Sequence, residues 1–153
     1  MSFNKAKEHL EKYNLEKNII VFEESTATVY EAAIALGCTE GEIAKSMGFV
    51  LNDKTILIIA AGNKKIDNAK FKAAFHVKAK MIPFEMVEEL TGHAAGGVCP
   101  FAVKSGVEVY LDESLKEYNF VYPACGNHHS AVKLTINELE SASEYISWVD
   151  VCK

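Results

Sequence analysis

The sequence contains no arginine: all sixteen basic residues are lysines, and 21 acidic residues give a formal net charge of −5. Proteins that coat nucleic acid without sequence preference depend on a broad positive excess to displace counterions, so this class is disfavoured for the chain as a whole. Lysine also lacks the planar fork that binds phosphate through two parallel hydrogen bonds. Any phosphate contact would therefore be made by a point charge.

Cysteine is sparse, and no Cys-x-x-Cys pair occurs among Cys38, Cys99, Cys125 and Cys152. This spacing is untypical of zinc ribbons and thioredoxin-like motifs, and it predicts reduced, unpaired thiols. No apolar run approaches the roughly 20 residues that span a bilayer, and residues 1–5 lack the apolar core of a signal peptide. We therefore expect a cytoplasmic protein that does not enter a membrane.

The hydrophobic content of 49% and the charged content of 24% are typical of one globular domain, which we expect to cover residues 1–153. Capping patterns and one-face apolar spacing predict helices over 5–13, 28–36, 68–75 and 83–91, another beginning at 135, and one or two helical turns over 39–45. Apolar runs predict a hairpin of 46–51 with 55–61, a short buried strand over 19–22, and strands over 107–111, 120–122, 131–134 and 146–151. Interleaved helices and strands predict a mixed α/β domain.

Two segments indicate a site for an oxyanion. Lys45 is expected at a helix-to-strand junction, where a cation can point into a cleft. The glycine-rich segment 96–101 provides a loop whose backbone can approach a ligand closely, because its glycines carry no side chain. A third segment, 124–130, is a polar turn between two apolar runs, and such turns often carry functional residues.

Positive charge is concentrated in one stretch of the chain, interrupted by a single acid, Asp67. The lysines are Lys64, Lys65, Lys70, Lys72, Lys78 and Lys80. This pattern suits either a solvated helix face or a local contact surface for phosphates.

The three segments Ile43-Ala44-Lys45-Ser46, Gly96-Gly97-Val98-Cys99-Pro100-Phe101 and Gly126-Asn127-His128-His129 together resemble the YbaK/prolyl-tRNA synthetase-associated editing domain family. Their order and spacing agree with the family, and the similarity covers roughly residues 20–151. The resemblance implies a mixed, barrel-like β-sheet surrounded by helices. It also implies trans-editing hydrolysis of a mischarged aminoacyl-tRNA, most often tRNA for proline carrying alanine, cysteine or a similarly small amino acid. The implied partners are tRNA and prolyl-tRNA synthetase, without a metal or another cofactor.

The resemblance also assigns candidate site residues. Lys45 matches the functional lysine of the family, Gly96, Gly97 and Pro100 match its loop, and His128 or His129 matches its histidine. Backbone N–H groups of Gly96 and Gly97 would meet the oxygen that becomes negative as water attacks the ester. Lys45, if charged, would stabilise the same oxygen or anchor the tRNA end.

The remaining candidates have less defined roles. Either histidine could orient the water or a ribose hydroxyl, or could simply cap its turn. For substrate binding we expect Pro100, Gly126, Lys70 and Lys72. Phe22, Tyr30 and Met47 are either walls of an amino-acid pocket or ordinary residues of the hydrophobic core.

Three alternatives stay open at the level of sequence. Cys99 or Cys125 could act as a nucleophile activated by His128 or His129. A metal could be held by His93 with the same two histidines. The chain could also be a noncatalytic module that binds tRNA or a synthetase through the segment 64–80.

Overall fold

The computed structural model describes residues 2–153, so Met1, the first residue of the domain expected over 1–153, lies outside the described part. Five α-helices occur in residues 2–153: α1 (Ser2–Glu11), α2 (Val29–Leu36), α3 (Asn68–Phe75), α4 (Val87–Thr91) and α5 (Ile136–Ser143). The strands of the same residues are β1 (Ile19–Val21), β2 (Ile43–Leu51), β3 (Lys54–Ala61), β4 (Glu108–Asp112), β5 (Phe120–Pro123), β6 (Ser130–Val132), β7 (Leu134–Thr135) and β8 (Ser147–Val149). None of these helices has the length and apolar character that crossing a membrane requires.

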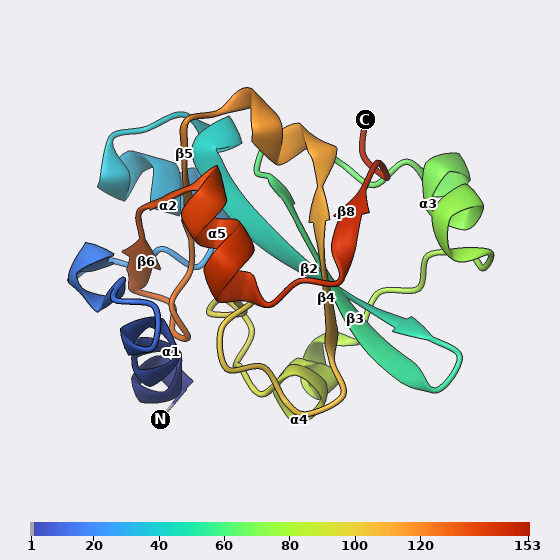
Figure 1. Ribbon diagram of the computed structural model, residues 1–153, viewed down its shortest axis with the longest axis horizontal. Coiled ribbons are helices and arrows are strands. Elements are labelled where there is room, and N and C mark those ends of the chain that lie inside the picture. Colours follow the sequence, from blue (N-terminus) through green and yellow to red (C-terminus); the bar gives the residue numbers. More distant parts are fainter. Residues whose placement is uncertain (1) are drawn as a thin grey trace.

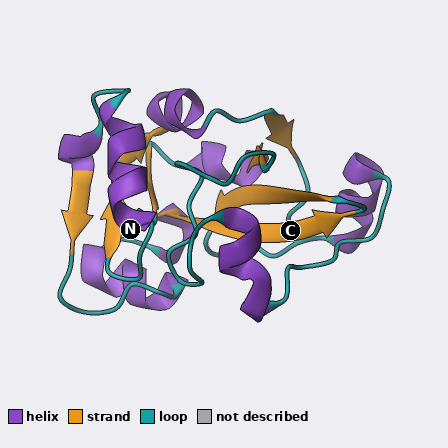
Figure 2. Ribbon diagram, turned by 90° about the horizontal axis from the view of Figure 1, so that it is seen from below, coloured by secondary structure: helices purple, strands orange, loops and turns teal. Residues whose placement is uncertain are grey.

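Six strands form one mixed sheet in the order β7-β5-β2-β3-β4-β8, which curls into a half-barrel, and β1 and β6 form a separate antiparallel pair. Figure 1 shows α1 and α2 at one end of the molecule and α3 at the other, with β2 and β3 running between them. Seen from below, helices lie on both sides of the strands (Figure 2). The expected mixed, barrel-like sheet surrounded by helices is confirmed.

The central strand β3 is buried on both faces, which explains its continuous apolar sequence. Leu57 and Ile59 face one hydrophobic cluster, which includes residues of α1 and α5. Ile56 and Ile58 face a second cluster, which includes Phe71 of α3 and the C-terminal residues Val151 and Cys152. The sheet therefore separates the molecule into two layers, one on each face.

The caps predicted from the sequence are present. At the start of α2 the Thr28 hydroxyl accepts a hydrogen bond from the Glu31 N–H at 3.1 Å, and Gly37 ends the helix with φ +68°. A second capping box, at Thr135, begins α5. These local signals were sufficient because a cap depends only on neighbours three or four residues away.

Two predictions about local structure were wrong. The segment 43–45 is not the end of a helix: only Glu40–Glu42 form a 3-10 turn, and Ile43 already begins β2 because it pairs with Tyr122 of β5. The expected strand 19–22 is not buried, since Ile20 and Val21 are 36% and 60% exposed. It belongs to the small β1-β6 pair, and Ile19 alone of the three β1 residues packs against the main hydrophobic cluster.

One expected strand is divided between two sheets. The run 131–134 contributes β6 to the pair with β1 and β7 to the main sheet, where β7 pairs with β5. Between them, the Lys133 N–H donates to the Asn18 carbonyl at 3.2 Å. Pairing partners distant in sequence decide this division, so the apolar run alone could not reveal it.

Candidate functional site

The edge of β2 that faces away from β3 is open at Ser46. In the tight hairpin, Leu51 pairs with Lys54, so odd-numbered residues of β2 exchange hydrogen bonds with β3 and even-numbered residues point their N–H and C=O outward. After Ser46, toward the C-terminal end of β2, the segment 80–82 covers this edge. The Val50 N–H donates to the Lys80 carbonyl at 2.9 Å, and the Ile82 N–H donates to the Gly48 carbonyl at 3.1 Å. Before Ser46, at the N-terminal end of β2, β5 covers the edge but pairs only with residues 43 and 44. Within residues 2–153, the Ser46 N–H and C=O therefore have no backbone partner.

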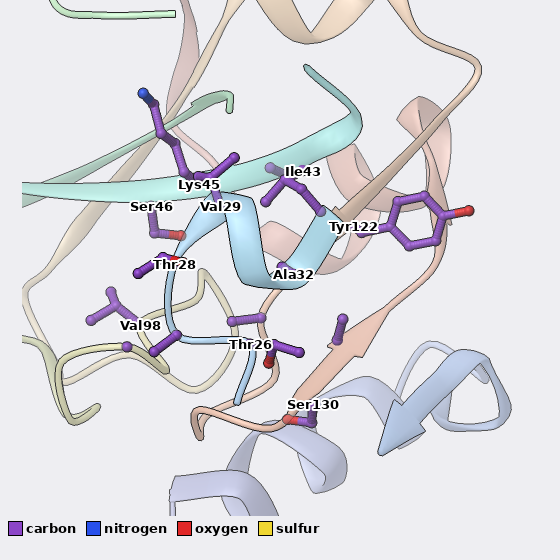
Figure 3. Close-up of a pocket in the computed structure, with 15 residues that line it drawn as sticks. Thr26, Thr28, Val29, Ala32, Ile43, Lys45, Ser46, Val98, Tyr122 and Ser130 are labelled. Carbon is purple, nitrogen blue, oxygen red and sulfur yellow. The ribbon is translucent and has the colours of Figure 1, made fainter. Parts of the chain in front are cut away.

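A cavity of about 140 Å³ lies at this opening. It is bounded by the start of α2, the first residues of β2, the glycine loop and the β5-β6 region, as Figure 3 shows. Its lining includes Thr26, Val29, Ala32, Lys45, Ser46, Gly96, Val98 and Ser130.

Two hydroxyl groups of residues at the cavity have no hydrogen-bond partner in the described part of the chain. The side-chain oxygens of Thr26 and Ser46 are both buried and both unpaired, and Thr26 is only 6% exposed. A buried polar group without a partner costs free energy, so such groups often mark a place where a ligand completes the bonding. The third lining hydroxyl, Ser130, already donates to Asn127 Oδ1 at 2.7 Å. Two residues that line the cavity, Thr26 and Ser46, thus carry unpaired hydroxyls whose oxygens are covered in this structure.

Lys45 lines the cavity, but its ammonium points away from it. Successive side chains of a strand lie on opposite faces, so Lys45 and Ser46 diverge, and Figure 3 shows the Lys45 nitrogen on the far side of β2 from Thr26 and Ser130. The ammonium donates to the Lys64 carbonyl. Burial lowers the pKa of Lys45 from its ordinary value, and the nearby charge of Lys65 acts in the same direction. No carboxylate pairs with this half-buried cation in the described part of the chain.

The two glycines of the loop differ. Gly96 lines the cavity with φ +89°, and its N–H has no acceptor among residues 2–153. The Gly97 N–H donates to the Ala94 carbonyl at 3.0 Å and closes a turn. Of the two amides expected to meet an oxyanion, only that of Gly96 is both free and at the cavity.

Gly97 instead allows two loops to pack backbone against backbone. A Cβ on Gly97 would lie 2.6 Å from the backbone nitrogen of Asn127, and the Gly126 N–H donates to the Gly97 carbonyl at 3.1 Å. Gly126 is in turn packed against the backbone of Ser2, where a Cβ would approach its carbonyl oxygen to 2.6 Å. Pro100 is buried and lies outside the cavity lining. These residues hold the loop in place but do not border the cavity.

The histidines lie at the rim. His128 is exposed and His129 is half-buried, with their rings 5.1 Å apart, and neither lines the cavity. Their backbones are engaged: the Thr26 N–H donates to the His128 carbonyl at 2.6 Å. A Cβ on Gly96 would lie 3.5 Å from the Cβ of His128, so this histidine is adjacent to the glycine loop.

The expected lysines lie on α3, outside the cavity lining. Lys70 donates to Asp150 at 3.1 Å and to the Cys152 carbonyl at 2.9 Å, whereas Lys72 is exposed and makes no ion pair within the described chain. The expected wall residues Phe22, Tyr30 and Met47 do not border this cavity either. Its apolar walls are smaller side chains, such as Val29, Ala32 and Val98.

The alternatives based on cysteine and metal find little support. Cys99 and Cys125 are fully buried, and burial raises the pKa of Cys99 strongly and that of Cys125 to about 12, which disfavours the reactive thiolate. His93 is also buried, between Ser2 Oγ at 2.8 Å and the Phe101 carbonyl at 2.7 Å. Residues 2–153 contain no group of three or more His, Cys, Asp or Glu side chains placed to hold a metal ion.

Comparison with known proteins connects this site to a family. The profile described as "Aminoacyl-tRNA editing domain" matches residues 23–142. The chain is 46% identical to the uncharacterized protein YwhH of Bacillus subtilis (strain 168), over 100% of this chain and 98% of that protein. It is also 27% identical to the proline–tRNA ligase of the same organism, over 84% of this chain but only 22% of the ligase.

A crystal structure described as a candidate trans-editing enzyme for prolyl-tRNA synthetase has a TM-score of 0.88 and 29% identity to this chain. The alignment covers 99% of this chain and 97% of that structure, so no large element of either fold is missing from the other. The matched profile includes α2, β2 and the glycine loop, which contribute to the cavity lining, and also the turn 126–129 beside the glycine loop. The chain therefore belongs to the aminoacyl-tRNA editing domain family.

Proposed function

We propose that this protein is a deacylase that hydrolyses the ester of a mischarged aminoacyl-tRNA, with tRNA for proline carrying alanine or cysteine as its substrate. The observation that carries the proposal is the open edge of β2, where unpaired hydrogen-bonding groups of Ser46 and Thr26 meet the free amide of Gly96 at a small cavity. The volume of about 140 Å³ suits a small amino acid. Membership in an editing family supports the same class of reaction.

The reaction needs no covalent nucleophile. A water molecule attacks the ester carbonyl, and a new carbon–oxygen bond forms as negative charge develops on the carbonyl oxygen. The bond to the ribose oxygen then breaks, and that oxygen takes up the proton that the water gave up. In this proposal the free N–H groups of Ser46 and Gly96 donate to the carbonyl oxygen while it is negative, and losing one such donor typically costs ~10² to 10³ in rate.

Lys45 adds positive charge to this site after a change of side-chain conformation. Its ammonium leaves the Lys64 carbonyl and reaches around the open edge of β2 to the carbonyl oxygen of the substrate. Such rotamer changes are common when a ligand binds. The movement breaks a hydrogen bond to a neutral carbonyl and no ion pair, because no acid of the described residues holds this lysine.

His128 and Lys72 would act on the tRNA outside the cavity. His128, exposed beside Gly96, would contact the ribose or phosphate at the tRNA end, and His129 would support its ring. Lys72 would contribute a phosphate contact from α3. Prolyl-tRNA synthetase is the proposed second partner, because it would produce the mischarged tRNA that this protein hydrolyses.

The test is a panel of tRNA for proline charged with alanine, cysteine, serine or proline. We expect the purified protein to release alanine or cysteine much faster than the spontaneous rate and to leave prolyl-tRNA intact. If it binds these tRNAs but accelerates none of the hydrolyses, the deacylase proposal fails. The noncatalytic binding module is then the correct interpretation.

A further inference from the structure

A second cavity, of about 200 Å³, adjoins the first on the other side of the open strand edge. The two cavities share Ser46, Gly96 and Val98 as a common wall. An ester placed against this wall would have its aminoacyl group in the first cavity. The nucleoside that carries the ester would then lie next to the second cavity.

The lining of the second cavity differs in chemistry from that of the first. It carries no charged side chain, and its residues include Met81, Ile82, Val87 and Ala95. The hydroxyl of Thr91, which also lines it, is already engaged as a donor to the Val87 carbonyl at 2.7 Å. Such a surface can receive a flat, weakly polar ring but offers little to a phosphate or to a charged amino acid.

Met81 stands at the mouth of this cavity and is 60% exposed. An exposed thioether is a favourable contact for the face or edge of an aromatic ring. Lys78 and Lys80 precede it on the same segment, both exposed and outside any ion pair within residues 2–153. An apolar cavity with exposed lysines on the segment that leads into its lining matches a nucleotide whose base is inserted and whose phosphate remains in solvent.

We propose that this second cavity binds the terminal adenine base of the aminoacyl-tRNA, with Met81 packed against the ring. The proposal rests on the proposed deacylase function, because it places the ester at the shared wall. It predicts that the base and the amino acid are recognised on opposite sides of Ser46.

The test uses a tRNA for proline that ends in the fluorescent base 2-aminopurine and carries alanine through a non-hydrolysable amide. We expect a saturable fluorescence change on binding to the wild type. Met81→Glu, which places a carboxylate against the base, should raise Kd about tenfold, the size expected for losing one stacked base. Met86→Glu is the matched control, since Met86 is exposed nearby but does not line this cavity, and it should leave Kd unchanged.

The outcomes separate this inference from the proposed function. An unchanged Kd for Met81→Glu, or tRNA binding without any change in 2-aminopurine fluorescence, would overturn the adenine site even if the wild type deacylates alanyl-tRNA normally. A shift in preference among alanine, serine and cysteine with unchanged Kd would also overturn it, because the second cavity would then hold the amino acid. A fluorescence response that Met81→Glu weakens supports the adenine site even in a protein without deacylase activity.

Discussion

Lys45 and Ser46 are neighbours in the chain, yet they lie in different environments on the two faces of β2. The Lys45 side chain lies on the face of α3 and the C-terminal segment, where its ammonium meets the Lys64 carbonyl and burial lowers its pKa. Ser46 lies on the face of the glycine loop, where its hydroxyl is unpaired. The cavity is therefore lined by the strand edge and by hydroxyl-bearing residues on one face of β2, whereas the Lys45 ammonium lies on the other face and must change conformation to reach it.

The largest effect is expected from Lys45→Ala, which removes the only cation bordering the cavity among the described residues. Because this ammonium would stabilise charge only in the transition state, we expect a loss of about 10² in the single-turnover rate of alanyl-tRNA hydrolysis. Lys54→Ala is the control, since Lys54 pairs with Glu108 at the far end of the hairpin. Full activity in Lys45→Ala would show that the groups at Ser46 and Gly96 hydrolyse the ester without the Lys45 ammonium.

A smaller effect is expected from Thr26→Val and Ser46→Ala, which remove the unpaired hydroxyls at the cavity. If each hydroxyl bonds the substrate, the rate should fall about tenfold, the usual value of one hydrogen bond. The free energy of unfolding should be unchanged or higher, because no bond within the protein is lost. Ser143→Ala removes another buried, unpaired hydroxyl away from the cavity and should not change the rate. Equal rates for all three variants would show that the hydroxyls do not contact substrate.

The pH dependence distinguishes the two faces in the intact protein. Burial lowers the pKa of Lys45, so its ammonium loses the proton at a lower pH than an exposed lysine does. After subtraction of spontaneous hydrolysis, the enzymatic rate should therefore fall as pH rises through this lowered pKa, because the ammonium loses its positive charge. Lys45→Ala should show no such bend. A bend that persists in the variant would assign the titration to another group.

The smallest effect is expected at the lysines of α3. The ammonium of Lys70 is already bonded to Asp150, which raises the pKa of Lys70, whereas Lys72 has no acid partner among residues 2–153. Lys72→Glu should weaken tRNA binding more than Lys70→Glu does. It should also reduce the slope of the logarithm of the binding constant against the logarithm of salt concentration by about one. Equal, negligible effects would show that both lysines belong to a solvated face.

The sequence predicted well those features that depend on near neighbours. The capped helices α2, α3 and α5 and the β2-β3 hairpin are confirmed, because caps and tight turns involve residues three or four apart. Of the candidate site residues, Lys45 and Gly96 both line the cavity, although the Lys45 ammonium points away from it, and their roles stay predictions. The family resemblance is confirmed by the match over residues 23–142.

Features that depend on pairing between distant segments were missed. Thr26 gave no signal, and Ser130 was only the last residue of the polar turn 124–130, because each becomes a cavity residue only when its segment meets β2. Ser46 stood inside a quoted motif, but its importance arises from the gap between β5 and the segment 80–82 along the β2 edge. Gly97 was expected to donate to substrate, and its amide is instead engaged by Ala94.

The central claim is that the ester carbonyl lies at the open edge of β2, between the N–H groups of Ser46 and Gly96. The most direct measurement is a crystal structure with adenosine carrying alanine through a 3′-amide in place of the ester. We expect the amide oxygen within hydrogen-bond distance of both N–H groups, with the alanine methyl group on the side of Val29 and Ala32. An amide oxygen bound on the opposite face of β2, or remote from Ser46, would contradict it.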